Sequence, residues 1–486
     1  MSKINIGKYA ILFFGCILFH MVGTWSIPLI DRDEPRFAEA SREMIERGDY
    51  IVPHFNNQLR PDKPPLAYWA QVASYRIFEE SDFAARFPSA AAAALVGLAI
   101  LAWGSRIGGE GVGWWAAIIF TLSLQTFVHA KAAVADMWLV LFMTTAHWSA
   151  YELVRDRLWP TDQASTLKHQ TLFWWFVLYS SLALGFLAKG PIAWTPLLTL
   201  AAMKLLVGDV ELAKRCKFVR GILLMLAIVA LWGVPALIQT DGEFLRIGIG
   251  RHVVGRSFGA MEGHGANSLG VYLLLLPFYF VTIFASFFPW SIKLPSLTRK
   301  LWRSRDKIDI YLITGVAIIF VIFGLIKTKL PHYTLPAFPL LSLLLARHLV
   351  DHRQFLKRCA IIAALIYLLL ALFVQSSAAR FFPAAQLFRQ TRDELRPEME
   401  FGAVDFQEPS LVWYFRSRVH GWMTPLNATT AVTFMGKSGP RFVVLPTALA
   451  GKIFPDPPAT WKTFTTRGFN IAKGKQVDLT LVLKPD

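Results

Sequence analysis

Long apolar runs separated by short polar segments dominate the first 375 residues of the chain. About eleven of these runs are long enough to cross the roughly 30 Å hydrocarbon core of a bilayer as helices. They lie near residues 9–30, 83–104, 112–131, 133–152, 171–188, 191–207, 219–240, 269–290, 309–326, 332–350 and 357–375. The pattern therefore predicts an all-α polytopic membrane protein with about 11 or more transmembrane helices.

After about residue 376 the long apolar runs stop, and the last roughly 110 residues have the patterning of a soluble α/β domain. The predicted elements are strands at 400–406, 441–445 and 477–483 and a helix at 409–418. We expect two domains, a transmembrane domain at 1–375 and a C-terminal domain at 376–486. An odd number of spans, starting from a cytoplasmic N-terminus, places the C-terminal domain on the outer face.

Composition supports this assignment and narrows the partners. Hydrophobic residues make up 54% of the chain, charged residues 17%, and the mean hydropathy is +0.43. The net charge of +17 arises largely from Lys and Arg in the segments 1–8, 104–111, 153–170, 204–220, 291–308 and 347–358, which the positive-inside rule assigns to the cytoplasm. We therefore expect contacts with anionic membrane lipids and no nucleic-acid partner.

The segment between the first two spans, roughly residues 31–82, is too long for an ordinary connection. It carries a helical pattern at Phe37, Ala40 and Met44 and two proline-pinned charged clusters. With the predicted topology, ionisable residues of several loops converge on the outer face, whereas the middles of the spans are nearly free of charge. These residues are Asp33, Arg36, Asp62, Lys63, Lys131, Asp136, Lys189, Arg251, His252, Arg256, Glu262, His264, Lys327, Lys329 and His332.

Structural explanations compete with a chemical role at each position. Asp33, ahead of Pro35, has the position of a helix cap, and Asp136 has the same position ahead of the fourth span. Lys63 fits a lysine whose amine reaches the membrane interface. The loop 251–264 fits either a solvated loop or a metal or phosphate site.

The outer-loop motifs resemble a known family. They are Asp33-Glu34-Pro35-Arg36-Phe37-Ala38-Glu39, Gly48-Asp49-Tyr50-Ile51-Val52-Pro53-His54, and Asp62-Lys63-Pro64-Pro65 with Tyr68-Trp69. This order resembles the first outer loop of the lipid A 4-amino-4-deoxy-L-arabinose transferases. Their wider family comprises polyprenyl-phosphate-sugar glycosyltransferases related to protein O-mannosyltransferases. The resemblance continues at Ala135-Asp136-Met137, Ala188-Lys189-Gly190, His252 to Arg256, Pro289-Trp290 and Lys329-Leu330-Pro331-His332-Tyr333-Thr334-Leu335-Pro336.

The resemblance implies a GT-C fold, which is a helical membrane core with a cavity on the periplasmic side. It implies catalytic roles for Asp33 and Asp136, which would handle the sugar or the acceptor. Arg36, Lys63 and Arg256 would bind the donor phosphate. Further candidate site residues from the same motifs are Glu34, Lys189, Lys329 and Tyr333.

A divalent metal ion, zinc or magnesium, is also implied by the resemblance. Its ligands here would be Asp62 with His252 or His264. Two features depart from the family pattern: Asp62 stands where the aminoarabinose transferases have Glu, and His252 precedes Arg256 by only four residues.

We therefore predict a multi-pass, inner-membrane, inverting glycosyltransferase with a periplasmic active site. It would transfer a sugar from undecaprenyl phosphate to a lipid A, glycan or protein acceptor, and it would need cations to neutralise the leaving phosphate. Because no phosphate-binding loop or dinucleotide fingerprint is present, we expect no nucleotide cofactor. The alternative class is a lipid or solute transporter or flippase, which would place its ligands near the bilayer midplane within repeats. The one-sided charges and the lack of repeats favour the enzyme.

Overall fold

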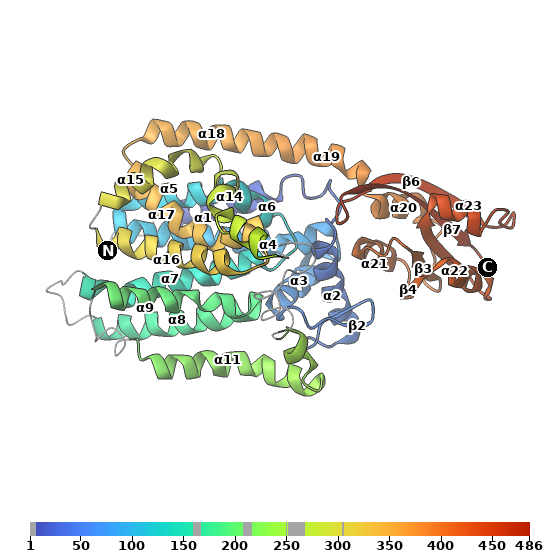
Figure 1. The fold of residues 1–486 in the computed structure, drawn as a ribbon, viewed down its shortest axis with the longest axis horizontal. Coiled ribbons are helices and arrows are strands. Elements are labelled where there is room, and N and C mark those ends of the chain that lie inside the picture. Colours follow the sequence, from blue (N-terminus) through green and yellow to red (C-terminus); the bar gives the residue numbers. More distant parts are fainter. Residues whose placement is uncertain (1–5, 159–166, 208–215, 249, 251–267, 304–305) are drawn as a thin grey trace. The chain divides into compact units, whose positions relative to one another are not determined.

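The computed structural model describes residues 6–158, 167–207, 216–248, 250, 268–303 and 306–486 (Figure 1). The chain forms two compact units. Unit 1 comprises residues 1–21, 61–67 and 87–368, and unit 2 comprises residues 22–60, 68–86 and 369–486. Most of the first outer loop thus shares a unit with the C-terminal residues. The predicted division of the chain at residue 375 remains a prediction.

Unit 1 is helical, and consecutive helices pack side by side. In Figure 1, α8 lies between α7 and α11. The elements are α1 (Ile6–Met21), α4 (Asp82–Gly108, which begins in unit 2), α5 (Glu110–Thr121), α6 (Leu124–Ala130), α7 (Asp136–Leu158), α8 (Leu167–Lys189), η1 (Pro191–Trp194), α9 (Thr195–Val207), α11 (Phe218–Gln239), α13 (Leu269–Leu274), α14 (Phe278–Ser286), η3 (Trp290–Lys293), α15 (Leu294–Arg303), α16 (Lys307–Leu325), η4 (Pro331–Ala337), α17 (Phe338–Leu349) and α18 (Arg353–Leu369).

Every apolar run predicted to cross the membrane contains helix. Within the described ranges, five helices are long and apolar enough to span a bilayer, or six if the bent pair α5 and α6 forms one span. Several other runs are short or broken: α1 has 16 residues and α9 has 13, while the run near 269–290 is divided between α13 and α14. Helix α7, with 23 residues, is long enough but less apolar than the five. The helical, polytopic class is therefore confirmed, whereas the number of spans is not.

In unit 2, the first outer loop contains the helix that its sequence pattern predicts. Helix α2 (Asp33–Arg47) buries the predicted stripe of Phe37, Ala40 and Met44. It ends at Gly48, whose φ of 65° is in the left-handed region that glycine adopts without strain. The two-stranded hairpin of β1 (His54–Phe55) and β2 (Gln58–Leu59) follows, and then α3 (Leu66–Phe78), which begins in unit 1.

The rest of unit 2 is the predicted α/β fold, a five-stranded sheet in the order β4-β3-β5-β7-β6. β4, β3 and β5 are parallel, while β7 is antiparallel to β5 and β6. Helices α20 and α21 cover one face, and α22 and α23 cover the other. The elements are η5 (Leu370–Val374), α19 (Gln375–Ala378), η6 (Ala379–Phe381), α20 (Pro383–Thr391), β3 (Glu400–Val404), α21 (Pro409–Arg416), β4 (Met423–Leu426), α22 (Ala428–Gly436), β5 (Arg441–Pro446), α23 (Thr447–Ile453), β6 (Lys462–Asn470) and β7 (Lys475–Lys484).

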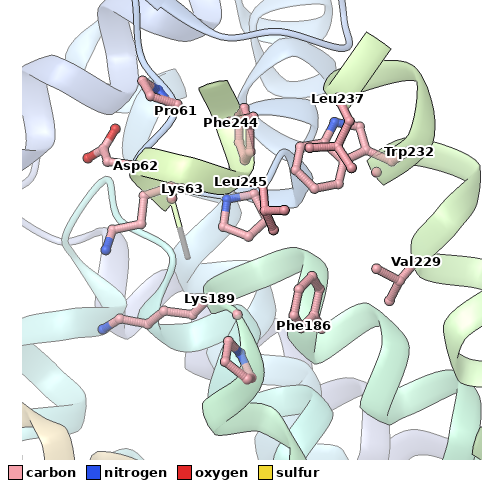
Figure 2. Close-up of a pocket in the computed structure, with 15 residues that line it drawn as sticks. Pro61, Asp62, Lys63, Phe186, Lys189, Val229, Trp232, Leu237, Phe244 and Leu245 are labelled. Atoms are coloured by element: carbon pink, nitrogen blue, oxygen red, sulfur yellow. The ribbon is translucent and has the colours of Figure 1, made fainter. Parts of the chain in front are cut away.

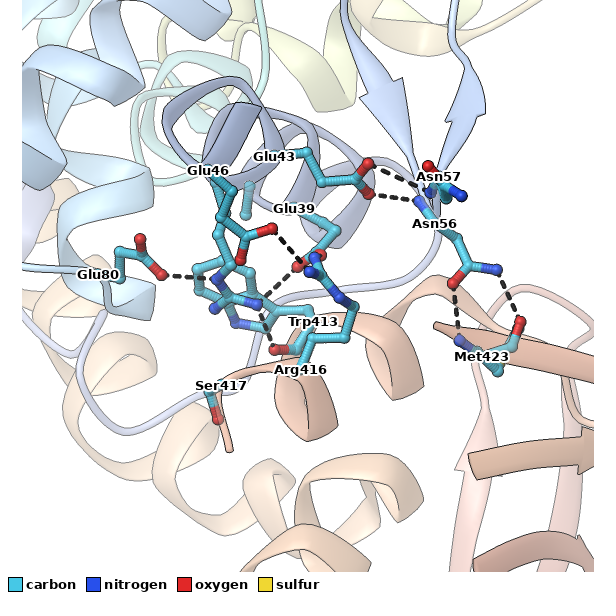
Figure 3. A network of polar contacts seen from close by, with 12 residues as sticks. Glu39, Glu43, Glu46, Asn56, Asn57, Glu80, Trp413, Arg416, Ser417 and Met423 are labelled. Carbon is cyan, nitrogen blue, oxygen red and sulfur yellow. Dashed lines mark hydrogen bonds and ion pairs between the residues drawn. The ribbon is translucent and has the colours of Figure 1, made fainter. Parts of the chain in front are cut away.

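A buried network of charges joins α2 to α21 (Figure 3). Arg42 donates to Glu39 at 2.6 Å and to Glu80 at 2.6 Å. Arg416 donates to Glu46 at 2.7 Å and also to Glu39. Because Glu39, Arg42 and Arg416 are almost completely buried, each depends on its partners to offset the loss of hydration.

The β1–β2 turn makes a second connection within unit 2. Asn56 exchanges two hydrogen bonds with the backbone of Met423, at 2.8 and 2.9 Å. The backbone N–H groups of Asn56 and Asn57 donate to the Glu43 carboxylate. Burial, and after it the neighbouring Glu39 carboxylate, raises the pKa of Glu43 to about 7. The start of β4 is thereby fixed to the first outer loop.

We predict that Arg416→Ala lowers the free energy of unfolding of unit 2 by about 3 kcal/mol, because Glu39 stays buried with one cation fewer. The measurement is hydrogen exchange of the α21 amides in the purified full-length protein. Lys462→Ala is the matched control, because it removes an exposed ion pair with Glu394 and should leave the exchange unchanged. Equal protection in Arg416→Ala and the wild type would show that the network adds no stability.

Candidate active site

Two helix ends bring together an acid and a base in unit 1. Asp136 begins α7 and Lys189 ends α8, positions at which the helix dipoles favour a negative and a positive side chain. Because α7 and α8 are antiparallel neighbours, Lys189 Nζ donates to Asp136 Oδ1 at 2.5 Å. The φ of 85° at Gly190 then lets the chain leave α8 directly after the lysine.

Two histidines lie beside this ion pair. His332, in η4, has its Nε2 atom 4.0 Å from Asp136 Oδ1. The ring centroid of His129, in α6, is 4.9 Å from that of His332. The Nδ1 atom of His129 is 2.9 Å from the Gln125 side-chain amide, which fixes the ring orientation.

These three side chains form a possible metal-binding group. Their ligand atoms, from His129, Asp136 and His332, all lie within 4.8 Å of one another. Two imidazoles and a carboxylate are a ligand set used by transition metals, so the group is chemically suited to a divalent ion. Lys189, which already donates to Asp136, would share that carboxylate with the ion.

A cavity of about 620 Å³ opens beside the ion pair and is large enough for a small-molecule ligand. Its polar end is formed by Lys63, Asp136, Lys189, His332 and Tyr333. The remaining wall is apolar and comes mainly from α9 and α16, through Trp194, Leu197, Leu198, Ala201, Ile322, Phe323 and Ile326. The cavity thus joins a charged end to a long hydrocarbon-like wall.

A smaller cavity of about 200 Å³ shares Lys63, Lys189 and Pro191 with the first. Figure 2 shows its lining, in which the Lys63 and Lys189 side chains extend toward the same side of the view. Asp62 also lines it, and Phe186, Val229, Trp232 and Phe244 supply apolar surface. The two lysines therefore mark the region where both cavities meet.

The structure brings together four of the predicted site residues, Lys63, Asp136, Lys189 and Tyr333, in the larger cavity. Lys329 has a different position, because its amine donates to the Phe323 and Gly324 carbonyls at the end of α16. Its contacts are those of a lysine that satisfies a helix C-terminus.

Asp33, Glu34 and Arg36 belong to unit 2. Asp33 is exposed in the first turn of α2, and the N-cap residue is Arg32, without a side-chain cap. Glu34 is buried and pairs with Arg86 at 2.8 Å, which gives it a structural role in unit 2. Arg36 is half-buried. The predicted residues His252, Arg256 and His264 lie outside the described residues.

His129 was not among the predicted site residues. It lies at the end of an apolar run, 112–131, and periodicity gives no sign that the α5–α6 pair bends by 67° there. The signal present in the sequence was its position seven residues before Asp136. A histidine in an outer turn close to a candidate acid should be considered as a partner of that acid.

The chain folds as a polytopic, helical membrane protein with the GT-C fold. Residues 62–233 match the family model described as dolichyl-phosphate-mannose-protein mannosyltransferase. An undecaprenyl phosphate-alpha-4-amino-4-deoxy-L-arabinose arabinosyl transferase of Edwardsiella ictaluri is 29% identical over 348 residues, which are 69% of this chain and 58% of that protein. The chain spans about three fifths of the length of the curated relatives that it matches, 60% and 58% for the first two.

Solved structures share the fold. The crystal structure of ArnT from Cupriavidus metallidurans bound to undecaprenyl phosphate superposes with a TM-score of 0.76, at 17% identity, over 98% of each chain. The archaeal oligosaccharyltransferase AglB from Archaeoglobus fulgidus gives 0.53, at 12% identity, over 98% of this chain and 74% of that one. The resemblance read from the sequence is confirmed, and the comparisons support a multi-pass inner-membrane protein.

We predict that Lys189→Met lowers the stability of unit 1 by about 3 kcal/mol, because Asp136 then keeps a buried charge without its cation. The loss of unfolding free energy in the double variant Asp136→Leu/Lys189→Met should be about 1 to 3 kcal/mol smaller than the summed losses of the two single variants. Thermal unfolding of the detergent-solubilised protein measures all three.

Lys8→Ala is the control for this cycle, since Lys8 forms an exposed ion pair with Glu110. It should leave the unfolding temperature unchanged. Additive effects of the Asp136 and Lys189 substitutions would mean that the two side chains do not stabilise each other.

Proposed function

We propose that this protein is an inner-membrane glycosyltransferase that takes its sugar from an undecaprenyl-phosphate-linked donor. The acceptor would be lipid A, another glycan or a protein at the periplasmic face. The observation that carries the proposal is the larger cavity of unit 1, in which lysines and a carboxylate adjoin a long apolar wall. The mannosyltransferase family match and the ArnT fold support it.

The cavity suits the two parts of a polyprenyl phosphate. The prenyl chain would lie along the α9 and α16 side chains, where burial of apolar surface favours binding. The phosphate would lie at the polar end, near Lys63 and Lys189, where a partly dehydrated site strengthens charge pairing. Lys63, which lines both cavities, is the proposed main phosphate ligand. Arg36 and Arg256 remain the proposed further ligands.

The proposed reaction is a direct displacement. The bond between the sugar anomeric carbon and the phosphate oxygen breaks, and its electron pair leaves with the lipid phosphate. An acceptor oxygen forms the new bond from the opposite side, which inverts the anomeric centre. If the acceptor is a hydroxyl, its proton passes to a carboxylate, for which Asp33 is the proposed base. A phosphate acceptor needs no base. Asp136 would orient the sugar or the acceptor.

We extend the proposal to a divalent metal ion. The group of His129, Asp136 and His332 fits zinc better than magnesium, because imidazole nitrogen suits zinc whereas magnesium prefers oxygen ligands. When bound, the ion would supply positive charge close to the phosphate. The ligand set from the family resemblance, Asp62 with His252 or His264, is the competing assignment.

Metal analysis separates these two ligand sets. After dialysis against zinc, we expect the purified wild-type protein to retain one equivalent, measured by inductively coupled plasma mass spectrometry. His129→Ala and His332→Ala should lose it, while the exposed-histidine control His420→Ala should keep it. Loss of zinc in Asp62→Ala and His252→Ala, with His129→Ala unchanged, would contradict the His129 site.

The transferase proposal is tested by mass spectrometry of glycolipids and glycoproteins from cells that lack the protein. Wild type should restore a sugar adduct that is missing in those cells. Lys63→Ala should abolish donor-lipid binding and leave polyprenyl-phosphate sugar to accumulate. With a hydroxyl acceptor, Asp33→Asn should keep donor binding but lose transfer, since only the proposed base is removed.

Lys300→Ala is the matched control, because this exposed lysine of α15 does not line the cavity. It should restore the adduct as the wild type does. An unchanged glycan and carrier-lipid profile in cells lacking the protein would point instead to transport or lipid binding. Wild-type activity of Asp33→Asn would remove Asp33 from the mechanism.

A further inference from the structure

The C-terminal sheet has a topological switch point in unit 2. The chain that leaves β3 leads to α21, whose Leu411 and Phe415 pack on one face of the sheet. The chain that leaves the neighbouring strand β5 leads to α23, whose Ala450 packs on the other face. In open α/β sheets the crevice outside the carboxyl ends of two such strands is the usual place for a ligand.

The β6–β7 hairpin forms a wall for this crevice. Pro446, the last residue of β5, pairs with Leu479 of β7. Residues 475–478 of β7, paired with 467–470 of β6, therefore extend past the end of β5. At about 3.4 Å per residue this extension is roughly 13 Å long. It projects beyond the strand ends, where the sheet would otherwise stop.

The wall is held in place by buried polar contacts. Asn470 is 3% exposed, and its amide donates to Glu408 at 2.9 Å while its carbonyl oxygen accepts from the Lys473 backbone. Glu408, also buried, accepts from Arg32 through its second oxygen at 3.2 Å. The hairpin is thus fixed before any ligand binds, which reduces the conformational entropy lost on binding.

A cavity of about 600 Å³ occupies the crevice. Its floor includes Asp405, Phe406 and Thr447 at the ends of β3 and β5, and its wall includes Lys473, Lys475 and Gln476. The Asp478 carboxylate is already paired with Arg467 at 2.9 Å. Lys473 Nζ donates to the Asp405 backbone carbonyl at 3.4 Å. With Asp478 paired to Arg467, the lining has two lysines and one further carboxylate, Asp405, so its net positive charge favours an anion.

The lining also restricts the class of anion. Phe406 is 3% exposed, so its ring offers no face on which a nucleobase could stack. The exposed groups are instead a carboxylate, an amide and two amines, which suit hydroxyl groups and a phosphate. We propose that this crevice binds a phosphorylated sugar, with Lys473 and Lys475 on the phosphate and Asp405 and Gln476 on the hydroxyls.

Two kinds of molecule carry a phosphorylated sugar: a free sugar phosphate, and a glycolipid with a phosphorylated head group. The proposal stands apart from the transferase reaction, because none of the crevice residues lines the cavities of unit 1. Binding in the crevice is therefore measurable in a variant without donor binding, such as Lys63→Ala.

The test is titration calorimetry of the full-length protein in nanodiscs with glucose 1-phosphate, glucose and inorganic phosphate as probes. We expect glucose 1-phosphate to bind at least tenfold more tightly than either of the others. Lys473→Ala/Lys475→Ala should weaken its binding at least tenfold, while Lys452→Ala, an exposed lysine of α23, should not. Nanodiscs that contain a phosphorylated lipid A form the second arm, and competition with glucose 1-phosphate would identify the head group as the source.

Hydrogen exchange of residues 470–478 locates the site, and it should slow when glucose 1-phosphate binds. Equal binding by the double lysine variant and the wild type would overturn the proposal. So would equal affinity for inorganic phosphate, because the sugar would then contribute nothing. Since the substituted lysines are exposed, both variants should fold, and circular dichroism checks this.

Discussion

The pairing of Asp136 with Lys189 is the interaction on which the candidate active site depends. A carboxylate and an amine that are largely buried at the ends of apolar helices are tolerable only because each neutralises the other. Their bond fixes the start of α7 against the end of α8. The chain after Lys189 then turns at Gly190 into η1 and α9, which supply the apolar wall of the larger cavity. One ion pair thus fixes both the charge and the shape of the cavity.

In unit 2, as in the candidate active site, buried charged side chains are paired with opposite charges. Glu39, Arg42 and Arg416 are buried between α2 and α21, and each has an oppositely charged partner from a distant part of the sequence. Polar pairing of this kind stabilises little compared with an apolar contact, but it tolerates few alternative arrangements. It therefore specifies which helix of the C-terminal fold packs on the helix of the first outer loop.

Local patterns predicted most of the elements but few of the long-range pairings. The stripe of Phe37, Ala40 and Met44 gave α2, and the alternation before Leu483 gave β7, because both patterns follow from short-range geometry. The hairpin strands β1 and β2 and the sheet strands β4 and β6 were not predicted. In β4, four residues with a central proline carry almost no strand signal. The expected eleven spans stay a prediction, since within the described ranges five or six helices are long and apolar enough to span a bilayer, and apolar runs do not show where a helix bends or breaks.

The candidate site was also predictable only in part, because its residues carry local signals whereas their contacts are long-range. Asp136 and Lys189 were found because charges stand out at the ends of apolar runs, and Lys63 because it lies in a proline-pinned charged cluster of the first outer loop. The prediction that they lie close together came from the predicted topology, which places their loops on one face. His129 was missed because its contact with His332 requires the bend between α5 and α6. The connection of Glu39 to Arg416 spans 377 positions, and no periodic pattern encodes such a pair.

The division of unit 2 among three chain segments has a consequence for biosynthesis. The ribosome makes α2 near the beginning of the chain, but α21 and its Arg416 follow only after residue 368, when all of unit 1 has been synthesised. During that interval Glu39 and Arg42 lack the α21 surface that later buries them. A ribosome that stops early, or a frameshift near the end of the gene, therefore damages the first loop as well as the tail. Quality control acting on the exposed α2 would detect an unfinished protein from its opening residues.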